Sequence, residues 1–449
     1  MAKNKKEMTP EERLAAALVP EEEQPYELPE GWKWVYGTGF FLPMETEYPT
    51  GDSFRYIDIE SIDNSVQRVR CPKNLPVKKA PSRASRKLHI GDTLFSMVRP
   101  YLKNIAYIDE EYSDCIGSTG FYVCTPTPLV DRHYLYWLMV SPFVVNGLNH
   151  FMKGDNSPSI RKGDIEKFVY PIPPLSEQHR LVARIESLFA KLDAAKEKVQ
   201  SVLDSHETRK AALLHDAFTG KLTAKWREEH QTELREIKQF PSKLKSAPNH
   251  VDALAGKWAL VRLGDVITWS SGGTPSRKHP EYYSGDIPWV KTGELNNTYI
   301  YDTSEKITKE AIAQSSAKVL PVNTVLLAMY GATIGKVGIL GVEAATNQAC
   351  ACGICSEWVD YRFLFYYLQS QKSSFICSGK GGAQPNISQT IIKQYEFPLP
   401  SLPEQQEIIR ILGRLLAREQ RARQAAEETL TAIDRMKQSI LARAFRGEL

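Results

Sequence analysis

The sequence predicts a duplicated α/β fold, in which two mixed α+β globules alternate with two long helices. Residues 171–222 align without a gap onto residues 398–449, always 227 positions later, and 15 of the 52 aligned pairs are identical. The shared positions include the prolines that open each segment and the Phe-x-Gly-x-Leu that closes it. A period this long is not that of a solenoid. It indicates two copies of a unit made of one globule and one helix.

The first copy begins with a charged, helix-prone arm, residues 1–24, which lacks a hydrophobic stripe long enough for a domain. Residues 25–173 are predicted to form the first globule. Runs of β-branched and aromatic residues at 54–59, 93–98 and 120–123 predict short strands, and the apolar segment 134–140 predicts a buried helix. Dense Pro and Gly between these runs indicate turns, so the globule is expected to be mixed α/β.

Prolines at 171, 173 and 174 end the globule, because proline removes a backbone donor and disfavours helix in the residue before it. The first long helix, within residues 174–222, is expected to run from near Ser176 to near Phe218, with Gly220 behind it as the C′ residue. Such a helix would be roughly 64 Å long at 1.5 Å per residue.

The second copy repeats this order. The polar residues 223–256 are predicted to be a connector, residues 257–400 the second globule, and residues 401–449 the second helical segment, with its helix from Pro403 to Phe445. The order arm, globule, helix, connector, globule, helix closes on itself if the arm follows the last helix in space. We therefore expect a circular, pseudo-twofold arrangement.

Apolar residues spaced by three and four predict a contact face along each helix. The residues expected to form the coiled coil or to dock a partner are Ile185, Leu188, Leu192 and Val199 in the first helix and Leu412, Leu415, Ile433 and Met436 in the second. At the aligned positions the first helix has His206 and Arg209 where the second has Ile433 and Met436.

Glu419 likewise replaces Leu192 in the second helix, so neither helix has a fully apolar stripe. We therefore expect the two helices to pair with each other, and to do so antiparallel if a pseudo-twofold axis relates the copies. The alternative is ordinary packing of each helix against a globular face.

Composition and charge exclude several classes of protein. The 449 residues are 42% hydrophobic and 24% charged, with a net charge of +4, which is ordinary for a globular protein. There is no apolar run of about 18 residues and no apolar leader, so we expect a cytoplasmic protein without a membrane partner. Seven cysteines, an odd number over a long chain, favour reduced thiols.

No motif of a catalytic site is present. The segment Gly379-Lys-Gly-Gly has the wrong spacing for a phosphate-binding loop, and neither a G-x-S-x-G elbow nor the Asn/Asp-Pro-Pro-Tyr of an amino-methyltransferase occurs. Cys350-Ala-Cys-Gly-Ile-Cys355 could suggest a metal site, but it lies in an apolar run typical of a buried strand. We therefore predict no catalytic residue, metal ion or cofactor in this chain.

The stretch from Arg68 to Lys103 has ten Lys or Arg residues and one acid, Asp92, which suggests contact with a polyanion. Lysine and arginine neutralise phosphates, and arginine can also bind guanine through two hydrogen bonds. A solvated basic loop is the alternative. The candidate DNA-contacting residues are Lys78, Lys79, Arg83, Arg86, Lys87, Arg99 and Lys103 in the first globule and Arg277, Lys278, Lys291, Tyr330, Lys336, Lys380 and Gln384 in the second.

Two globules alternating with two proline-headed helices resemble the specificity subunit of Type I restriction–modification systems over nearly the whole chain. The resemblance rests on Pro173-Pro-Leu-Ser-Glu-Gln and Pro400-Ser-Leu-Pro-Glu-Gln at the helix starts, and on Ala217-Phe-Thr-Gly-Lys-Leu and Ala444-Phe-Arg-Gly-Glu-Leu at the helix ends. It also rests on the segment from Tyr56 to Asp63 in the first globule and on Gly285-Asp-Ile-Pro-Trp-Val and Gln384-Pro-Asn-Ile-Ser in the second.

The resemblance implies a non-catalytic reader of double-stranded DNA. Each globule would be a target recognition domain for one half of a split site. The helices would form an antiparallel coiled coil that sets the gap and docks two methyltransferase (modification) subunits and, where present, two restriction subunits. S-adenosylmethionine and ATP would bind those partners. A coiled-coil scaffold that does not bind DNA, or a stand-alone DNA-modifying enzyme, are the two alternatives.

Overall fold

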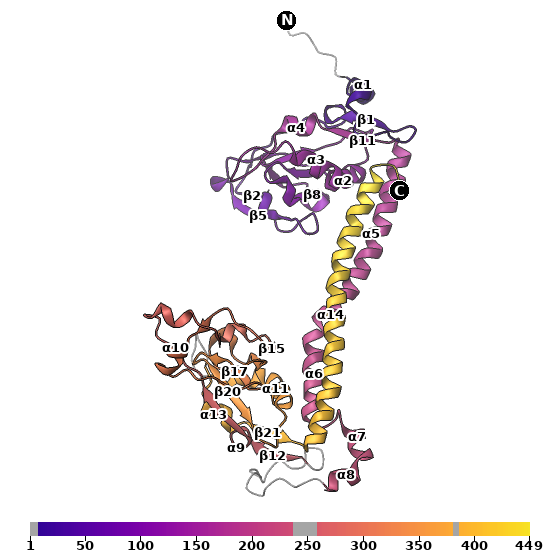
Figure 1. The fold of residues 1–449 in the computed structure, drawn as a ribbon. Coiled ribbons are helices and arrows are strands. Elements are labelled where there is room, and N and C mark those ends of the chain that lie inside the picture. The colour runs from indigo at the N-terminus through magenta and orange to yellow at the C-terminus, as the bar shows by residue number, and fades with distance from the viewer. Residues whose placement is uncertain (1–7, 237–257, 380–385) are drawn as a thin grey trace. The chain divides into compact units, whose positions relative to one another are not determined.

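The computed structural model describes residues 8–236, 258–379 and 386–449, which form two compact units. Unit 1 is Met1–Gln200 with Glu427–Leu449, and unit 2 is Ser201–Ala426. Each unit holds one α/β globule and one stretch of paired helices (Figure 1). The mixed α/β class predicted for both globules is confirmed.

Unit 1 begins with the arm and ends its globule at β11. Its elements are α1 (Pro10–Ala16), β1 (Lys33–Tyr36), β2 (Ser53–Ile57), β3 (Ile62–Asp63), β4 (Arg68–Val69), β5 (Lys73–Pro76), β6 (Ala84–Arg86), β7 (Thr93–Ser96), β8 (Ile105–Tyr107), β9 (Ile116–Ser118), β10 (Phe121–Cys124), α2 (Arg132–Val140), α3 (Pro142–Asn149), α4 (Lys162–Glu166), β11 (Val169–Ile172) and most of α5 (Leu175–Asp204).

Unit 2 begins with the end of α5 and includes the first part of α14. Its other elements are α6 (His206–Phe218), α7 (Ala224–Glu229), α8 (Gln231–Glu236), β12 (Ala259–Arg262), α9 (Leu263–Val266), β13 (Ile267–Ser271), β14 (Ile287–Val290), β15 (Tyr299–Ile300), β16 (Lys306–Ile307), α10 (Lys309–Ala313), β17 (Val325–Ala328), β18 (Val337–Leu340), β19 (Ala345–Thr346), β20 (Cys350–Cys355), α11 (Tyr361–Ser370), α12 (Lys372–Ser378), α13 (Gln389–Gln394) and β21 (Glu396–Leu399); α14 is Leu402–Ala444.

The two globules share their central strand pairings, although the corresponding sheets differ in the number of outer strands. In unit 1, β2 pairs antiparallel with β5 and parallel with β9, and in unit 2, β14 pairs antiparallel with β16 and parallel with β19. β7 lies between β10 and β8 as β17 lies between β20 and β18. The first and last strands also pair in each globule, β1 with β11 and β12 with β21. The duplication therefore extends from the helices to the globules.

The predicted strands and the predicted buried helix of the first globule are confirmed. The three β-rich runs become β2, β7 and β10, and every residue of β7 and β10 is buried. The apolar segment 134–140 lies in α2, whose Tyr134, Leu135 and Leu138 are buried against the sheet. The cysteine segment of the second globule is β20, with Cys350 and Cys352 fully buried. Burial raises the pKa of the Cys352 thiol to about 11.

The second long helix is confirmed as the unbroken α14, 43 residues long. The Gly447 N–H donates to the Ala444 carbonyl and the Glu448 N–H to the Arg443 carbonyl, which is the Schellman closure expected around a left-handed glycine.

The first long helix is confirmed as α5 and α6, which are separated by Ser205 alone: α5 ends at Asp204, α6 begins at His206, and the Arg209 N–H still donates to the Ser205 carbonyl. The Ser205 hydroxyl donates back to the Ser201 carbonyl at 2.7 Å, and the Arg209 guanidinium donates to the Val202 carbonyl at 3.0 Å. Side chains that take helical carbonyls in this way bend or interrupt a helix. At the sequence level, serine and arginine are tolerated in helices, so the interruption left no signal.

The first part of the predicted connector is helical. Residues 224–236 form α7 and α8, and Thr223 before them is fully buried with its hydroxyl donating to the Glu404 carboxylate at 2.8 Å. Arg227 of α7 lies 3.3 Å from the same carboxylate. The remainder of the connector, residues 237–256, lies outside the described residues.

The N-terminal arm is part of the first globule. The backbone of residues 17–19 bonds to β1, with the Val19 N–H donating to the Trp34 carbonyl and the Tyr36 N–H to the Ala17 carbonyl. Farther along, the Tyr26 hydroxyl donates to the Phe445 carbonyl at the end of α14, at 2.9 Å. The chain's start therefore follows its last helix in space, as the predicted circular arrangement requires.

The helices pair antiparallel within each unit (Figure 1). In unit 1, Lys196 binds Asp434 at 3.0 Å and Asp193 binds Lys437, so the order of partners reverses along the chain. In unit 2, Arg209 binds Glu419 at 2.7 Å, part-buried between the helices. Arg209 and Glu419, which interrupt the predicted apolar contact faces of the two helices, therefore meet each other.

One residue predicted to lie in the contact face between the helices does not lie there. Ile185, Leu412 and Ile433 are buried as predicted, whereas Met436 is half-exposed and lies off the packed face. The other predicted seam residues, Leu188, Leu192, Val199 and Leu415, are partly buried. Met436 occupies the position aligned with Arg209, which binds Glu419. The residue aligned with Glu419 in the first helix is Leu192, so the contact made by Arg209 has no equivalent at Met436.

A buried glutamine fixes each globule to its helix. The Gln178 side chain accepts from the Asp131 N–H at 2.7 Å and donates to the carbonyls of Leu129 and Pro173. The aligned Gln405 accepts from the Asp360 N–H at 2.9 Å and donates to the carbonyls of Trp358 and Pro400. Both side chains are fully buried. A neutral amide is needed there because only an amide offers an acceptor and two donors together.

Replacing Gln405 by Glu should loosen the second globule from α14. A carboxylate would face two carbonyls without a proton to donate, at a cost of about 1–3 kcal/mol. Hydrogen exchange of α11, whose capping residue Asp360 donates to Gln405, should become faster than in the native chain. The neighbouring exposed Gln406→Glu is the matched control and should leave exchange unchanged. Equal exchange in the two variants would contradict the anchoring role.

Candidate nucleic-acid interface

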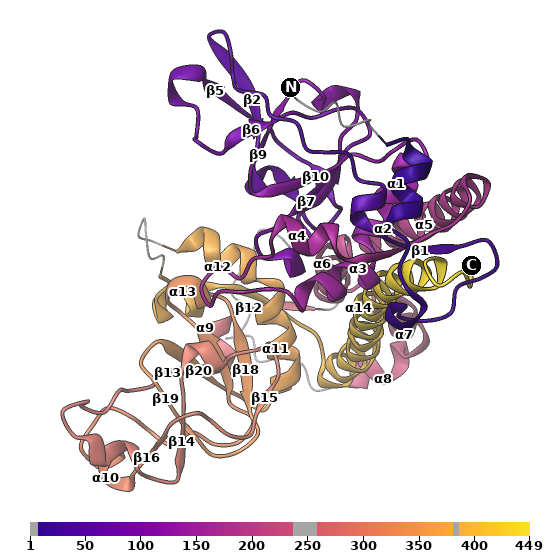
Figure 2. The same ribbon diagram turned by 90° about the horizontal axis from the view of Figure 1, so that it is seen from above.

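Five of the seven predicted basic residues of the first globule lie on or beside strands of the β5-β2-β9-β6 sheet, whose strands are labelled in Figure 2. Lys78 and Lys79 are exposed in the 3₁₀ helix that follows β5, and Arg83 is exposed just before the edge strand β6. Arg86 is on β6 and partly buried. Lys87 is paired with Glu45 at 3.3 Å, so its charge is already balanced.

Arg99 and Lys103 bracket a second loop, after β7, and both have left-handed backbones, with φ of 48° and 54°. Side chains other than glycine pay roughly 1–2 kcal/mol for this conformation. The Arg99 guanidinium donates to the Asn156 carbonyl at 2.8 Å. Burial lowers the pKa of the Lys103 ammonium, and within the described residues no carboxylate lies in ion-pair distance of it.

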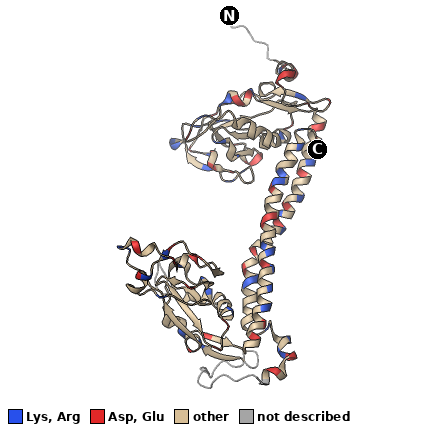
Figure 3. Cartoon of the chain, viewed as in Figure 1, with Lys and Arg blue, Asp and Glu red and all other residues tan. Residues whose placement is uncertain are grey.

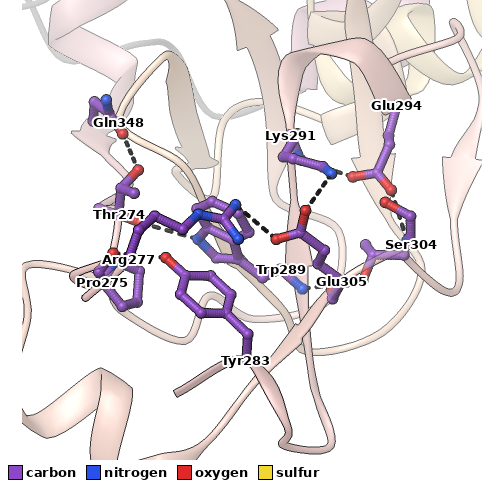
Figure 4. Close-up of polar contacts among 12 residues, drawn as sticks. Thr274, Pro275, Arg277, Tyr283, Trp289, Lys291, Glu294, Ser304, Glu305 and Gln348 are labelled. Atoms are coloured by element: carbon purple, nitrogen blue, oxygen red, sulfur yellow. Dashed lines mark hydrogen bonds and ion pairs between the residues drawn. The ribbon is translucent and has the colours of Figure 1, made fainter. Parts of the chain in front are cut away.

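In the second globule, Arg277 is held flat over an aromatic ring (Figure 4). Its guanidinium carbon lies 3.9 Å from the centre of the Tyr283 ring and 5.4 Å from that of Trp289. The Glu305 carboxylate binds it from the side at 2.7 Å. A stacked, ion-paired guanidinium is fixed in orientation, which suits it to directional hydrogen bonding.

Lys291 also binds the Glu305 carboxylate, at 2.8 Å. The first globule has an ion pair at the equivalent positions, with the acid and the lysine exchanged. Lys291 directly follows β14 as Asp58 directly follows β2, and Glu305 faces Trp289 across the sheet as Lys73 faces Tyr56. In the first globule Lys73 binds Asp58 at 2.6 Å.

The sign of each charge is therefore interchangeable while the pairing is kept. The lysine contact lowers the pKa of the Glu305 carboxyl, and the Asp58 contact raises the pKa of Lys73 to about 12. We interpret Lys291 as one member of an ion pair that ties the strands together, rather than as a DNA contact.

The remaining candidates of the second globule are placed as follows. Lys278 is exposed beside Arg277, Tyr330 is exposed after β17, and Lys336 is partly buried before β18. Lys380 and Gln384 lie outside the described residues. The structure therefore brings Arg277 and Lys291 together through Glu305 and leaves Tyr330 and Lys336 on a separate loop.

Three functional features were missed by sequence reasoning. Glu305 was not a candidate, because an acid in a polar loop has no distinguishing pattern. Gln178 and Gln405 were recognised as identical residues, but their anchoring bonds depend on backbone groups that a sequence does not place. The exposed Tyr101 and Leu102 were also missed; a large residue between Arg99 and Lys103 would have been the only available signal.

Acidic and basic side chains are interspersed over the described ranges, including along the helices (Figure 3). Nowhere in these ranges do three or more His, Cys, Asp or Glu side chains gather in a way that could hold a metal ion. Across residues 8–236, 258–379 and 386–449, no helix combines the length and apolar character needed to cross a membrane.

Arg277 and its neighbour Lys278 should differ in how their loss affects DNA binding. Arg277→Ala should cost roughly 1–3 kcal/mol on the cognate duplex and little on a scrambled one, because its oriented guanidinium can read a base edge. Lys278→Ala should weaken both duplexes alike and reduce the slope of log K against log salt by about one unit. Titrations at two salt concentrations measure both effects; identical behaviour of the two variants would contradict this assignment.

Comparison with known proteins places these features in one family. The model of the Type I restriction modification DNA specificity domain matches residues 54–203 and 255–428, once for each globule with part of the helix that follows it. The EcoDI specificity subunit of Escherichia coli is 26% identical over 342 residues, covering 73% of this chain and 72% of its own length. The StySPI specificity subunit of Salmonella potsdam is 24% identical over 449 residues, covering 94% and 90%.

Solved structures agree with the sequence comparisons. A chain from a study of complex assembly and conformational transition of the type I R-M system aligns with a TM-score of 0.76 and 26% identity, covering 95% of this chain and 100% of that one. The HsdS subunit from Thermoanaerobacter tengcongensis aligns over the same shares with a TM-score of 0.62 and 26% identity. The two matched domains, the paired helices and the continuity of both alignments lead to one conclusion: this chain belongs to the Type I restriction–modification DNA specificity family, as a specificity subunit.

Proposed function

We propose that this subunit reads a split DNA target, each globule recognising one half, while the paired helices hold the two readers. The observation that carries the proposal is the duplicated topology with divergent loop chemistry. Both globules share the central strand pairings, yet equivalent loops differ in charge and size, as do Arg99–Lys103 and Gly331–Gly335. Readers of one fold with different surfaces are suited to two different short sequences.

The exposed lysines and arginines of both globules support duplex DNA as the ligand. Lys78, Lys79 and Arg83 near β5 and β6, and Arg277 and Lys278 before β14, offer cations for phosphates and bidentate donors for guanine. Cellular DNA as the ligand would place the action of the protein in the cytoplasm.

We further propose that the chain acts without catalysis of its own and recruits two modification subunits, one for each copy of the repeat, with restriction subunits joining where the host has them. The partly exposed helices support this role. Leu175 and Leu402, identical residues at aligned positions, are large apolar side chains left exposed at the starts of these helices. Equivalent exposed positions on a duplicated chain suit two copies of one partner. The transferred methyl group and ATP would be handled by these partners.

Exchanging residues 25–173 for those of a relative should change one half of the recognised sequence and leave the other half and the gap intact, because the helices and second globule are retained. Mapping modified adenines across the host genome, with and without the exchange, measures this. Exchange of residues 257–400 is the reciprocal control and should change the other half. A continuous palindromic target, or both halves changing together, would contradict the split reader.

A further inference from the structure

The loop Arg99–Lys103 of the first globule takes the place of the loop Gly331–Gly335 in the second: each joins two paired strands, β7 to β8 and β17 to β18, and each begins with the same turn. In both loops the N–H of the fourth residue donates to the carbonyl of the first, which has a left-handed backbone. Leu102 donates to Arg99 at 2.9 Å, and Ile334 donates to Gly331 at 3.1 Å. The preceding residues also match, with Ile160 donating to Met97 and Ile387 to Met329.

The left-handed residues coincide as well, and there the two chains differ. Gly331 and Gly335 have φ of 62° and 78°, where glycine pays no steric cost. Arg99 and Lys103 adopt the same conformations at φ of 48° and 54°. Strain of this kind persists where the side chains have a use that glycine cannot serve.

The side chains inside the two loops also differ, being larger and more exposed in the first loop than in the second. Tyr101 is 45% exposed and Leu102 39% exposed, whereas Ile334, at the place of Leu102, is buried. From Thr93 to Ile108 the sequence contains no acid. The first loop is therefore a cationic turn with two large apolar side chains at its tip, and the second is a small, nearly uncharged one.

We propose that the Arg99–Lys103 loop enters a groove of duplex DNA at the first globule's half-site, with Lys103 on a backbone phosphate and Tyr101 and Leu102 against sugars and base edges. This proposal rests on the proposed DNA-reading function. Arg99, bonded to the Asn156 carbonyl, fixes the loop against the neighbouring segment rather than reading a base itself.

Lys103 is the residue that points most directly to an anion. It is partly withdrawn from water, and the described residues supply no carboxylate to compensate it. A cation in that position gains more from a phosphate than an exposed lysine does, because less water must be displaced when the phosphate arrives. The apolar pair beside it gains from leaving water, and duplex grooves offer thymine methyl groups and sugars as apolar partners.

The test replaces the loop by its counterpart: Arg99→Gly, Pro100→Ala, Tyr101→Thr, Leu102→Ile and Lys103→Gly together. Because the grafted loop has the same length, closes the equivalent pair of strands and places glycine at both left-handed positions, the variant should fold and show an unchanged or higher thermal unfolding temperature. In complex with the modification subunits, it should bind the cognate duplex roughly 5- to 100-fold more weakly. It should no longer distinguish that duplex from one scrambled in the first half-site, and should still reject one scrambled in the second.

Two single variants separate the roles and serve if the graft is unstable. Tyr101→Thr should reduce discrimination at the first half-site, and Lys103→Gly should weaken all duplexes and reduce the salt slope by about one unit. Tyr48→Ala removes another exposed aromatic of the same globule, 71% exposed, and should change neither.

Native discrimination in Tyr101→Thr or in the folded graft, or an equal loss in Tyr48→Ala, would overturn the assignment of the loop. Failure of the native complex to prefer the cognate duplex over both scrambled ones would instead refute the proposed DNA-reading function.

Discussion

A protein with two recognition domains needs each globule to be held in a fixed orientation on its long helix. In both copies of the repeat, one buried glutamine amide makes this connection. Gln178 and Gln405 each bind three backbone groups that belong to different segments of a globule: a strand-to-helix junction, a capping residue and the proline that opens the long helix. Because the bonds are buried and the partners are backbone atoms, the orientation they set does not depend on the variable side chains of the recognition loops. The recognition surface can change while its mounting is conserved.

The polar residues of the paired helices favour pairing of the first long helix with the second over pairing of either helix with a second copy of itself. Each helix has polar residues where the other is apolar, and in unit 2 Arg209 and Glu419 meet between the helices. A part-buried ion pair of this kind adds little net stability, but removing one partner leaves a charge uncompensated. The pair therefore selects one partner and one direction more than it strengthens the association.

The sequence predicted the architecture well because its signals were long and repeated. The 227-residue offset, the proline helix openings and the heptad spacing each involve many residues, so single substitutions cannot hide them. The irregularity at Ser205 was missed because it depends on local side-chain bonds, such as that of Arg209 to the Val202 carbonyl, which serine and arginine do not always make. The helices at 224–236 were missed because their start is held by Glu404, which is distant in the chain. Candidate site residues were chosen mainly by charge, and charge could not separate Arg277 from Lys291: Glu305 binds both, but only Arg277 also stacks on the Tyr283 ring.

The meeting of Arg209 and Glu419 also limits how such a gene can recombine. The two residues are encoded far apart, on either side of the second globule. A crossover with a relative anywhere between them, followed by retention of the foreign end, combines one parent's arginine with the other parent's residue opposite. A single crossover upstream of Arg209 exchanges the first globule and leaves both residues from one parent. Exchange of the second globule preserves the pair only by a double crossover that returns to the original parent before Glu419, so the two globules should be exchanged by different recombination events.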